Sequence, residues 1–174
     1  MNVQTKSLGM ASEVQVYNNF LDKTIFNELK KILLKNDNFP YFFIDHKIDE
    51  GDGFPQFVHQ FYYGQTINSE YYHLLDPILD KLNPTSLIRI KINLQMKDTQ
   101  IRMTGMHNDF DDPLENQKTG IFYMNTNNGK TIFEDGEEID SVENRMVIFP
   151  ASKRHAGTTH TDTIYRSVIN FNWF

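Results

Sequence analysis

A histidine and an aspartate stand two positions apart in this 174-residue chain, in the segment His107-Asn108-Asp109. In extended backbone, residues i and i+2 point to the same side, so both side chains could bind one metal ion. His155 follows 48 residues after His107, between a predicted strand and a glycine, and is a candidate third ligand. Two histidines and one carboxylate form a facial set that leaves positions open on Fe(II), which suits bidentate 2-oxoglutarate and O₂.

A candidate anion-binding residue follows the third ligand. Arg166 stands 11 residues after His155 and lies on the more polar face of the last predicted strand. A guanidinium group can hold a carboxylate through two parallel N–H donors, so Arg166 could bind the remote carboxylate of 2-oxoglutarate. Taken singly, a His-x-Asp segment is a weak signal and a strand arginine often packs or pairs with a neighbouring acid. Their combination is more specific than either feature.

Strands must position these residues, and the second half of the chain is rich in strand patterns. Apolar residues alternate with polar ones over residues 88–96, which predicts a strand with one apolar face. Turn signals separate four further strand candidates at residues 120–125, 130–133, 145–149 and 163–173. Many short strands with frequent turns favour a β-sandwich or jelly roll.

The first half predicts helices and two aromatic strands. Ile25, Leu29, Ile32 and Leu33 recur at helical spacing over residues 23–35, behind a possible cap at Asp22. A second stretch with helical spacing covers about residues 69–82 and ends before Pro84. The segments 41–44 and 57–63 read as strands.

Composition narrows the function classes. With no cysteine, the chain has neither disulfides nor thiolate metal ligands, so any metal must bind histidine and carboxylate. A net charge of −6 and an isoelectric point near 5.4 argue against nucleic acid as a partner. The N-terminus carries no apolar segment typical of a signal peptide, and no apolar run is long enough for a membrane span, so we expect a soluble cytoplasmic protein.

Four segments together resemble the 2-oxoglutarate/Fe(II)-dependent dioxygenases, in particular the prolyl-4-hydroxylase-like branch. They are MHNDFDD, GIFYMN, NRMVIFPASKRHAG and YRSVINFNWF, and their order and spacing match that family from about residue 88 to the C-terminus. The resemblance implies a mostly β fold with flanking helices, built as a cupin-like double-stranded β-helix. It also implies one domain over residues 1–174, with N-terminal helices and supporting strands in residues 1–85 and a jelly-roll catalytic core in residues 86–174.

The same resemblance implies an enzyme that binds Fe(II) and uses 2-oxoglutarate and O₂ to hydroxylate a C–H bond. The iron ligands would be His107, Asp109 and His155, with Arg166 on the co-substrate. Asp109 favours hydroxylation, because the related halogenases lack this carboxylate. The substrate suggested by the branch is a prolyl residue in a peptide or protein, although small molecules remain open.

Three further residues are candidates for contacts in the pocket. Tyr123 lies 16 residues after His107, where the family commonly places a tyrosine on the 2-oxoglutarate carboxylate. Alternation puts Tyr123 and Phe122 on opposite faces of one strand, so only one of the two rings can face the metal. Asn93 and Asn170 stand on polar strand faces and could line the pocket or bind buried backbone.

Other histidines and acids are weaker candidates for metal ligands. His160 competes with His155 for the third position, because it also lies between the strand at residues 145–149 and Arg166. Asp111 and Asp112 lie in a predicted turn and are not expected to be ligands. The remaining histidines have no partner at ligand spacing and are interpreted as solvated or core residues: His46, His59 and His73.

Two other functions compete with an oxygenase. A Zn-dependent hydrolase or lyase on a cupin-like barrel would use the same ligand types, but would give Arg166 and Tyr123 no role. A jelly-roll binding module without catalysis would be expected to lack one of the three ligands, and all three are present.

Overall fold

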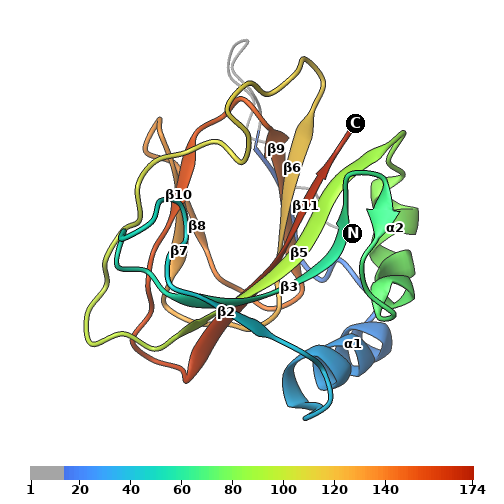
Figure 1. The fold of residues 1–174 in the computed structure, drawn as a ribbon, viewed down its shortest axis with the longest axis horizontal. Helices are drawn as coiled ribbons and strands as arrows, with labels where there is room; N and C mark the ends of the chain where they lie inside the picture. The colour runs from blue at the N-terminus through green and yellow to red at the C-terminus, as the bar shows by residue number, and fades with distance from the viewer. Residues whose placement is uncertain (1–13) are drawn as a thin grey trace.

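The computed structural model describes residues 14–174 and consists mainly of two antiparallel β-sheets that face each other (Figure 1). The strands of the larger sheet are β1 (Gln15–Tyr17), β2 (Phe42–Ile44), β3 (Gln56–Tyr63), β4 (Thr66–Ile67), β5 (Leu87–Met96), β6 (Lys118–Tyr123), β9 (Arg145–Pro150) and β11 (Tyr165–Trp173). Those of the smaller sheet are β7 (Lys130–Phe133), β8 (Glu138–Asp140) and β10 (His155–Gly157).

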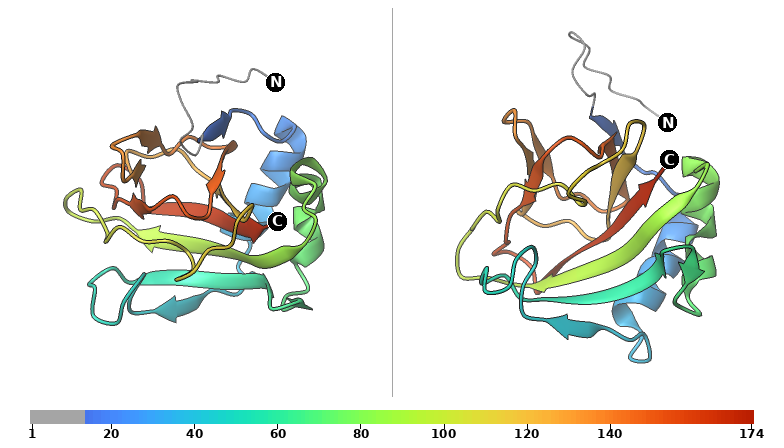
Figure 2. Two further views of the ribbon diagram at one scale, coloured as in Figure 1. Left: turned by 90° about the horizontal axis from the view of Figure 1, so that it is seen from above. Right: turned by 45° about the horizontal axis from the view of Figure 1, so that its top comes forward.

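The strand order is that of a double-stranded β-helix. The larger sheet runs β1-β9-β6-β11-β5-β3-β2, with β4 paired to β3, and the smaller runs β10-β7-β8. The helices lie on one side of the larger sheet in every view, opposite the smaller sheet (Figures 1 and 2). The jelly-roll core with helices packed on it is therefore confirmed.

Helix α1 (Lys23–Lys35) has the predicted bounds. The carboxylate of Asp22 accepts a hydrogen bond of 2.8 Å from the backbone N–H of Thr24, which satisfies one free donor of the first turn. Leu29 and Leu33 are buried as predicted, whereas Ile25 is 40% exposed and Ile32 is only partly buried. Phe26 is buried in place of Ile25. The ring of Phe26 packs edge-on against Phe122 of β6, so α1 closes the outer face of the larger sheet.

The second helical stretch is shorter than its apolar spacing suggested. A 3₁₀ helix spans Tyr72–Leu75 and continues into α2 (Asp76–Leu82). The helix ends at Asn83, which adopts a left-handed conformation with φ of 46°, before Pro84. A left-handed residue followed by proline stops a helix, as the sequence predicted.

The inner sides of β5 and β6 differ in polarity. On β5, Ile90 and Ile92 belong to the apolar core beneath the helices, whereas the alternate residues from Arg89 to Gln95 line cavities inside the barrel. On β6, Phe122 packs towards the helices and Tyr123 packs inside the barrel against Phe133 and Phe149, among others. The expected opposition of Phe122 and Tyr123 is thus observed. The barrel interior is apolar at β6 and polar at β5.

Both halves of the chain build the larger sheet. Strand β3 pairs along β5, with Phe57 opposite Leu94, and β2 extends the sheet beyond β3. The strands that the sequence did not predict are short, namely β1, β4, β8 and β10. Strand β8 lies in an acidic segment, and its three residues are too few to show an alternating pattern.

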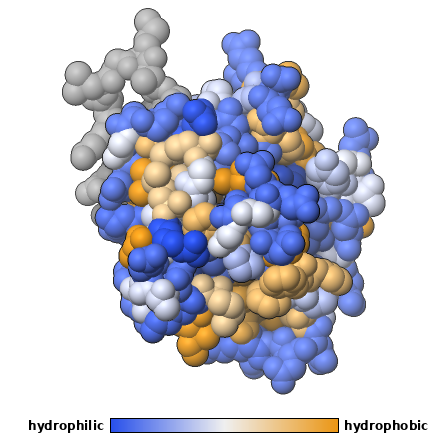
Figure 3. All heavy atoms as spheres, turned by 60° about the vertical axis from the view of Figure 1, so that its left-hand side comes forward, coloured by the Kyte–Doolittle hydropathy of each residue, from blue (hydrophilic) through white to orange (hydrophobic). Residues whose placement is uncertain are grey.

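On the side where β7, β8 and β10 lie, the surface is hydrophilic with separate apolar patches (Figure 3). Within residues 14–174, neither helix has the length and apolar character that a bilayer crossing demands. The residues on which the expectation of an absent signal peptide chiefly rests, 1–13, lie outside the described part of the chain.

Gly120 is tightly packed beneath the C-terminal strand. A Cβ atom there would lie 2.9 Å from the ring of Trp173 and 3.4 Å from the sulfur of Met146. We expect Gly120→Ala to lower the free energy of unfolding by about 1–3 kcal/mol, as overpacking of a core does. Gly105→Ala is the control, since its new Cβ meets only Ile48 at 3.7 Å. Urea denaturation of both variants checks this, and equal stability would contradict the packing.

His59 is a core residue that is hydrogen-bonded in its neutral form. Its Nδ1 lies 2.8 Å from the carbonyl oxygen of Pro40, which can only accept, and its Nε2 lies 2.7 Å from the hydroxyl of Ser69. Burial lowers the pKa of His59 below its ordinary value, partly offset by the bond to Pro40. The interpretation of His59 as a satisfied core histidine is confirmed.

A lowered histidine pKa makes stability fall with acidification. Because the unfolded chain binds the proton more readily, the contribution of His59 is present above its unfolded pKa, near 6.5, and is lost as the pH falls below it. We expect His59→Gln to show a smaller loss of unfolding free energy between about pH 7 and pH 5 than the wild type. His73→Gln, at an exposed position, should keep the wild-type slope. Denaturant titrations at several pH values provide the measurement.

Candidate metal centre and its pocket

The two histidines of the candidate triad face each other across a backbone bridge. His107 and His155 are antiparallel partners, and each backbone N–H donates to the carbonyl of the other at 3.0 Å. Opposed residues of such a pair carry their side chains on the same side, and the two ring centroids lie 4.7 Å apart. Asp109 follows two residues after His107, and one potential ligand atom from each of the three lies within 4.8 Å of the others. The structure therefore brings His107, Asp109 and His155 together.

His160 does not join this group. Its side chain is fully buried and its backbone carbonyl accepts a hydrogen bond from Asp98. The backbone bridge selects His155, because only that histidine is opposite His107. Asp111 and Asp112 are exposed and lie outside the cluster, and His46 and His73 each contact a neighbouring aspartate instead.

The imidazoles are held in a form that binds metals. Nδ1 of His107 lies 3.1 Å from the carbonyl oxygen of Gly105, so it donates and leaves Nε2 free. Burial lowers the pKa of both histidines, to about 4 for His155, and the charge of Asp109 only partly opposes this. Nδ1 of His155 is buried without a hydrogen-bond partner within residues 14–174. Neutral imidazoles accept a metal ion without first losing a proton.

Asp109 is held at both carboxylate oxygens. Oδ1 lies 3.0 Å from a guanidinium nitrogen of Arg89, and Oδ2 accepts a hydrogen bond of 2.7 Å from Asn172. Arg89 also donates to the amide oxygen of Asn172 at 3.1 Å. Burial alone would raise the pKa of Asp109, but Arg89, His155 and Asn172 lower it to about 2. The carboxylate is therefore ionised and oriented before any ligand binds.

Arg89 and Asn172 were not predicted as site residues. A signal was present, since Arg89 shares the polar face of its strand with Asn93, and Asn172 shares that of Arg166. The registers bring the two residues together, because Asn172 of β11 lies opposite Arg89 of β5. The sequence could not show which polar residues of each strand would reach Asp109.

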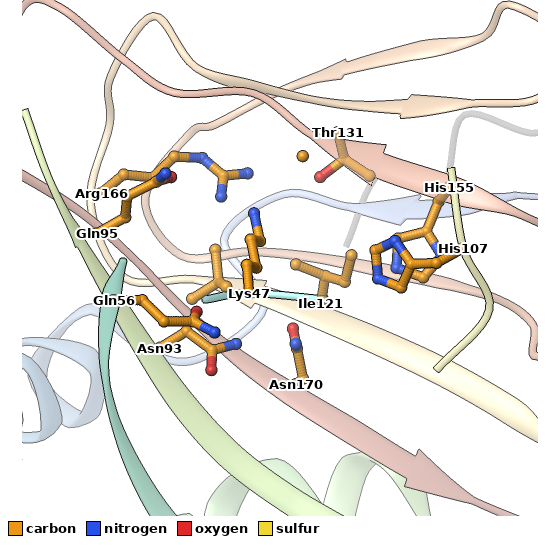
Figure 4. Close-up of a pocket in the computed structure, with 12 residues that line it drawn as sticks. Lys47, Gln56, Asn93, Gln95, His107, Ile121, Thr131, His155, Arg166 and Asn170 are labelled. Atoms are coloured by element: carbon orange, nitrogen blue, oxygen red, sulfur yellow. The ribbon is translucent and has the colours of Figure 1, made fainter. Parts of the chain in front are cut away.

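A cavity extends from the two histidines to Arg166 (Figure 4). Arg166 is 6% exposed, its Nε donates to the hydroxyl of Ser141 at 3.0 Å, and its guanidinium lies over the ring of Tyr123. No carboxylate lies within ion-pair distance of Arg166 among residues 14–174. Leaving a buried cation without a counter-charge is costly, so this end of the cavity is suited to an anion.

The other predicted pocket residues fall into two groups. Asn93 and Asn170 line the cavity, and the amide oxygen of each is buried without a hydrogen-bond partner. Tyr123 is fully buried beside the cavity, and its hydroxyl donates to the hydroxyl of Thr131 at 2.7 Å. Thr131 itself lines the cavity. The hydroxyl proton of Thr131 remains available to a ligand.

Lys47 is a pocket residue that sequence reasoning missed. It lies in the loop between β2 and β3, and Figure 4 shows its side chain between Arg166 and the two histidines. The carboxylate of Asp52 accepts from the backbone N–H groups of Lys47, Ile48 and Phe54, at 2.8–2.9 Å, and so folds this loop. Burial lowers the pKa of Lys47 to about 7, and the charges of Arg166 and Lys91 add to this. No periodicity marks a loop residue, so no sequence pattern pointed to Lys47.

The fold recurs in solved structures of oxygenases, although neither a family model nor a curated protein matches the chain. An oxidoreductase of the 2OG-Fe(II) oxygenase family from Burkholderia pseudomallei aligns with a TM-score of 0.66 and 16% identity, over 93% of this chain and 84% of that one. A Pseudomonas putida prolyl-4-hydroxylase aligns with a TM-score of 0.57 and 14% identity, over 92% and 91%.

HygX from Streptomyces hygroscopicus, solved with nickel, 2-oxoglutarate and hygromycin B bound, aligns with a TM-score of 0.58 and 10% identity, over 92% of this chain and 82% of that one. At such low sequence identities, the alignments show a shared backbone arrangement. The chain therefore has the double-stranded β-helix fold of the 2-oxoglutarate/Fe(II) oxygenases, with His107, Asp109 and His155 gathered as a facial triad.

Proposed function

We propose that this protein is an Fe(II)- and 2-oxoglutarate-dependent oxygenase that hydroxylates a C–H bond of its substrate. The observation that carries the proposal is the pairing of two features across one cavity: a partly buried facial triad at one end, and at the other a buried guanidinium with no acid partner within residues 14–174. One feature suits Fe(II) and the other suits the remote carboxylate of a short diacid. Either feature alone would be compatible with many functions.

The residues of the triad fit a divalent iron. His107, Asp109 and His155 would hold Fe(II) with two nitrogens and one oxygen and leave the remaining positions to co-substrate and O₂. When bound, the iron supplies the redox chemistry by which 2-oxoglutarate and O₂ give succinate and CO₂ while one oxygen atom enters the C–H bond. Arg89 and Asn172 keep Asp109 ionised and aimed at the ligand position, as outer partners of metal ligands do.

The opposite end would orient the co-substrate. Arg166 would bind the remote carboxylate of 2-oxoglutarate through its guanidinium edge. Because Tyr123 already donates to Thr131, we infer that Thr131 donates its own proton to that carboxylate and that Tyr123 acts through Thr131. Asn93 lines the same cavity, and its side-chain NH₂ group would donate to this ligand. The proposal thus keeps Tyr123 and Asn93 as co-substrate residues, with Tyr123 in an indirect role.

The competing functions do not explain why the triad and the unpaired Arg166 share one cavity. A Zn-dependent hydrolase or lyase would use the triad but would not require a buried, unpaired Arg166 at the far end of its pocket. A binding module would not require two neutral imidazoles and an ionised carboxylate held together. For the substrate, the resemblance to the prolyl-4-hydroxylase-like branch suggests a prolyl residue in a peptide or protein, and the fold likeness to the Pseudomonas enzyme is compatible with that class.

The direct test begins with anaerobic protein. Addition of Fe(II) and 2-oxoglutarate should produce their visible charge-transfer absorption, and admission of air should release succinate. A wild-type protein that shows neither the absorption nor succinate would refute the oxygenase. Tight binding of Zn(II) without either signal would favour the hydrolase or lyase.

The choice between the two candidate histidines is testable by metal binding. We expect His155→Ala to weaken Fe(II) binding by more than the roughly 10–100-fold that loss of an outer partner causes, because it removes a ligand. His160→Ala is the matched control and should bind Fe(II) as the wild type does. Anaerobic calorimetry measures both, with circular dichroism as a check on folding. If His160→Ala loses the metal and His155→Ala keeps it, the ligand set is wrong.

Arg166 should act on the co-substrate and not on the metal. We expect Arg166→Gln to weaken 2-oxoglutarate binding by roughly 10–100-fold, the loss of a charge-assisted hydrogen-bonded pair worth about 1.5–3 kcal/mol. Arg166→Lys should restore little, because an ammonium lacks the planar pair of donors. Titration of 2-oxoglutarate into anaerobic Fe(II)-protein gives the affinity. Loss of Fe(II) affinity in parallel would mean that Arg166 has a structural role.

A further inference from the structure

A second cavity opens beside the triad, on the inner side of β3 and β5. We call it the basic cavity, and it is lined by His46, Lys47, Gln56, Gln60, Arg89 and Lys91, among others. Lys47 and Gln56 line the triad cavity as well, so the two spaces adjoin. Arg89 contacts Asp109 of the triad directly. A ligand in the basic cavity would therefore sit next to the candidate iron position.

Positive charge in these two cavities exceeds what the protein itself can balance. No aspartate or glutamate lines either of them. Arg89 pairs with Asp109, and Arg166 is assigned above to the co-substrate. Lys47 and Lys91 form no ion pair within residues 14–174. The charge of Lys91 is close enough to disfavour the charged form of Lys47.

This excess of positive charge is confined to the two cavities and is not a property of the whole chain. The formal net charge is −6, and other lysines with acids nearby do form pairs, such as Lys30 with Glu143 and Lys130 with Glu138. The charge of a lysine with a purely structural role would be stabilised by such an acid partner or by exposure to solvent. Burial lowers the pKa of Lys47 to about 7 and that of Lys91 to about 8, because neither charge has an acid partner in the cavity. An anion between them would favour the charged form of both lysines, so the cavity is suited to an external anion.

Lys47 is closely packed at its tip. A Cβ atom at Gly157 of β10 would lie 2.6 Å from the Lys47 ammonium nitrogen, so this nitrogen lies directly against the β10 backbone that lines the triad cavity. Lys91 lines the basic cavity but not the triad cavity. A substitution of Lys91 therefore tests the basic cavity without changing the lining of the co-substrate site.

We propose that the basic cavity binds an anionic group of the primary substrate, a carboxylate or a phosphate, through Lys47 and Lys91. The inference rests on the proposed function, because it places the substrate's reactive C–H bond next to the triad by anchoring the substrate's charge at Lys91. A neutral substrate would leave both ammonium groups without a counter-charge.

The test measures anion binding and not turnover. Inorganic phosphate and acetate are titrated separately into metal-free protein, and again into anaerobic protein saturated with Fe(II) and 2-oxoglutarate, with calorimetry as the readout. We expect the wild type to bind at least one of them in both states, and the double variant Lys47→Gln/Lys91→Gln to bind it roughly tenfold or more weakly, a difference of about 1.4 kcal/mol or more. Tighter binding of phosphate indicates a phosphorylated substrate, and tighter binding of acetate a carboxylate.

Two variants serve as controls. Lys118→Gln removes an exposed lysine of β6 and should leave anion affinity unchanged. Arg166→Gln should keep anion binding in the metal-free protein, whereas Lys91→Gln should keep the wild-type affinity for 2-oxoglutarate. The proposal is overturned if the wild type binds neither anion, if the double variant binds as the wild type does, or if Arg166→Gln alone abolishes binding.

Failure of the proposed function would give a different pattern. Protein that binds neither Fe(II) nor 2-oxoglutarate but keeps lysine-dependent phosphate or acetate binding would refute the oxygenase while leaving the anion site in place.

Discussion

The antiparallel pairing of β5 with β11 is the interaction on which the rest of the structure depends. Its register places Gln95 opposite Arg166 at one end and Arg89 opposite Asn172 at the other. The first pair lies by the co-substrate end of the cavity, and the second holds Asp109. A slip of one residue would turn these polar side chains to the outside of the barrel and carry the isoleucines of β5 inside. The apolar core beneath the helices therefore also fixes the geometry of the site.

The barrel interior is divided between packing and charge. Around β6 and β9 it is filled by apolar side chains such as Val147 and Phe149, which hold the two sheets together. Along β5 and β11 it contains cations and amides, several of whose polar atoms have no partner within residues 14–174. Unpaired buried polar atoms oppose folding, so they mark the part of the barrel that is built for ligands and not for stability.

The similarity to solved oxygenases at 10–16% identity has a physical basis. A barrel of this kind requires strands with alternating polar and apolar residues, turns between them and an apolar core, and many different sequences provide these. The metal centre requires particular residues, because two histidines must lie opposite each other across a backbone bridge and a carboxylate must follow the first of them at i+2. Here that constraint is met by the single pairing of His107 with His155. The loops and the N-terminal strands are free to differ, and Lys47 comes from such a loop.

Local patterns in the sequence determined several features correctly. Alternation over residues 88–96 gave β5 and its polar face, Asp22 gave the start of α1, and the His-x-Asp spacing gave two side chains on one side of the backbone. Each depends only on the geometry of neighbouring residues, which periods of 2 and 3.6 express directly. The order of four motifs along the chain, read as a family resemblance, supplied the jelly roll and the candidate triad.

Only the tertiary structure decided the contacts between segments distant in the chain. The choice of His155 over His160 came from a backbone bridge, and the roles of Arg89 and Asn172 came from strand register. Lys47 and Lys91 line one cavity beside the triad because the loop between β2 and β3 folds back towards β5. These relationships depend on which strands pair and where each loop closes. The physical reason is that sequence periodicity records the direction of a side chain, whereas its partner is set by packing of the whole chain.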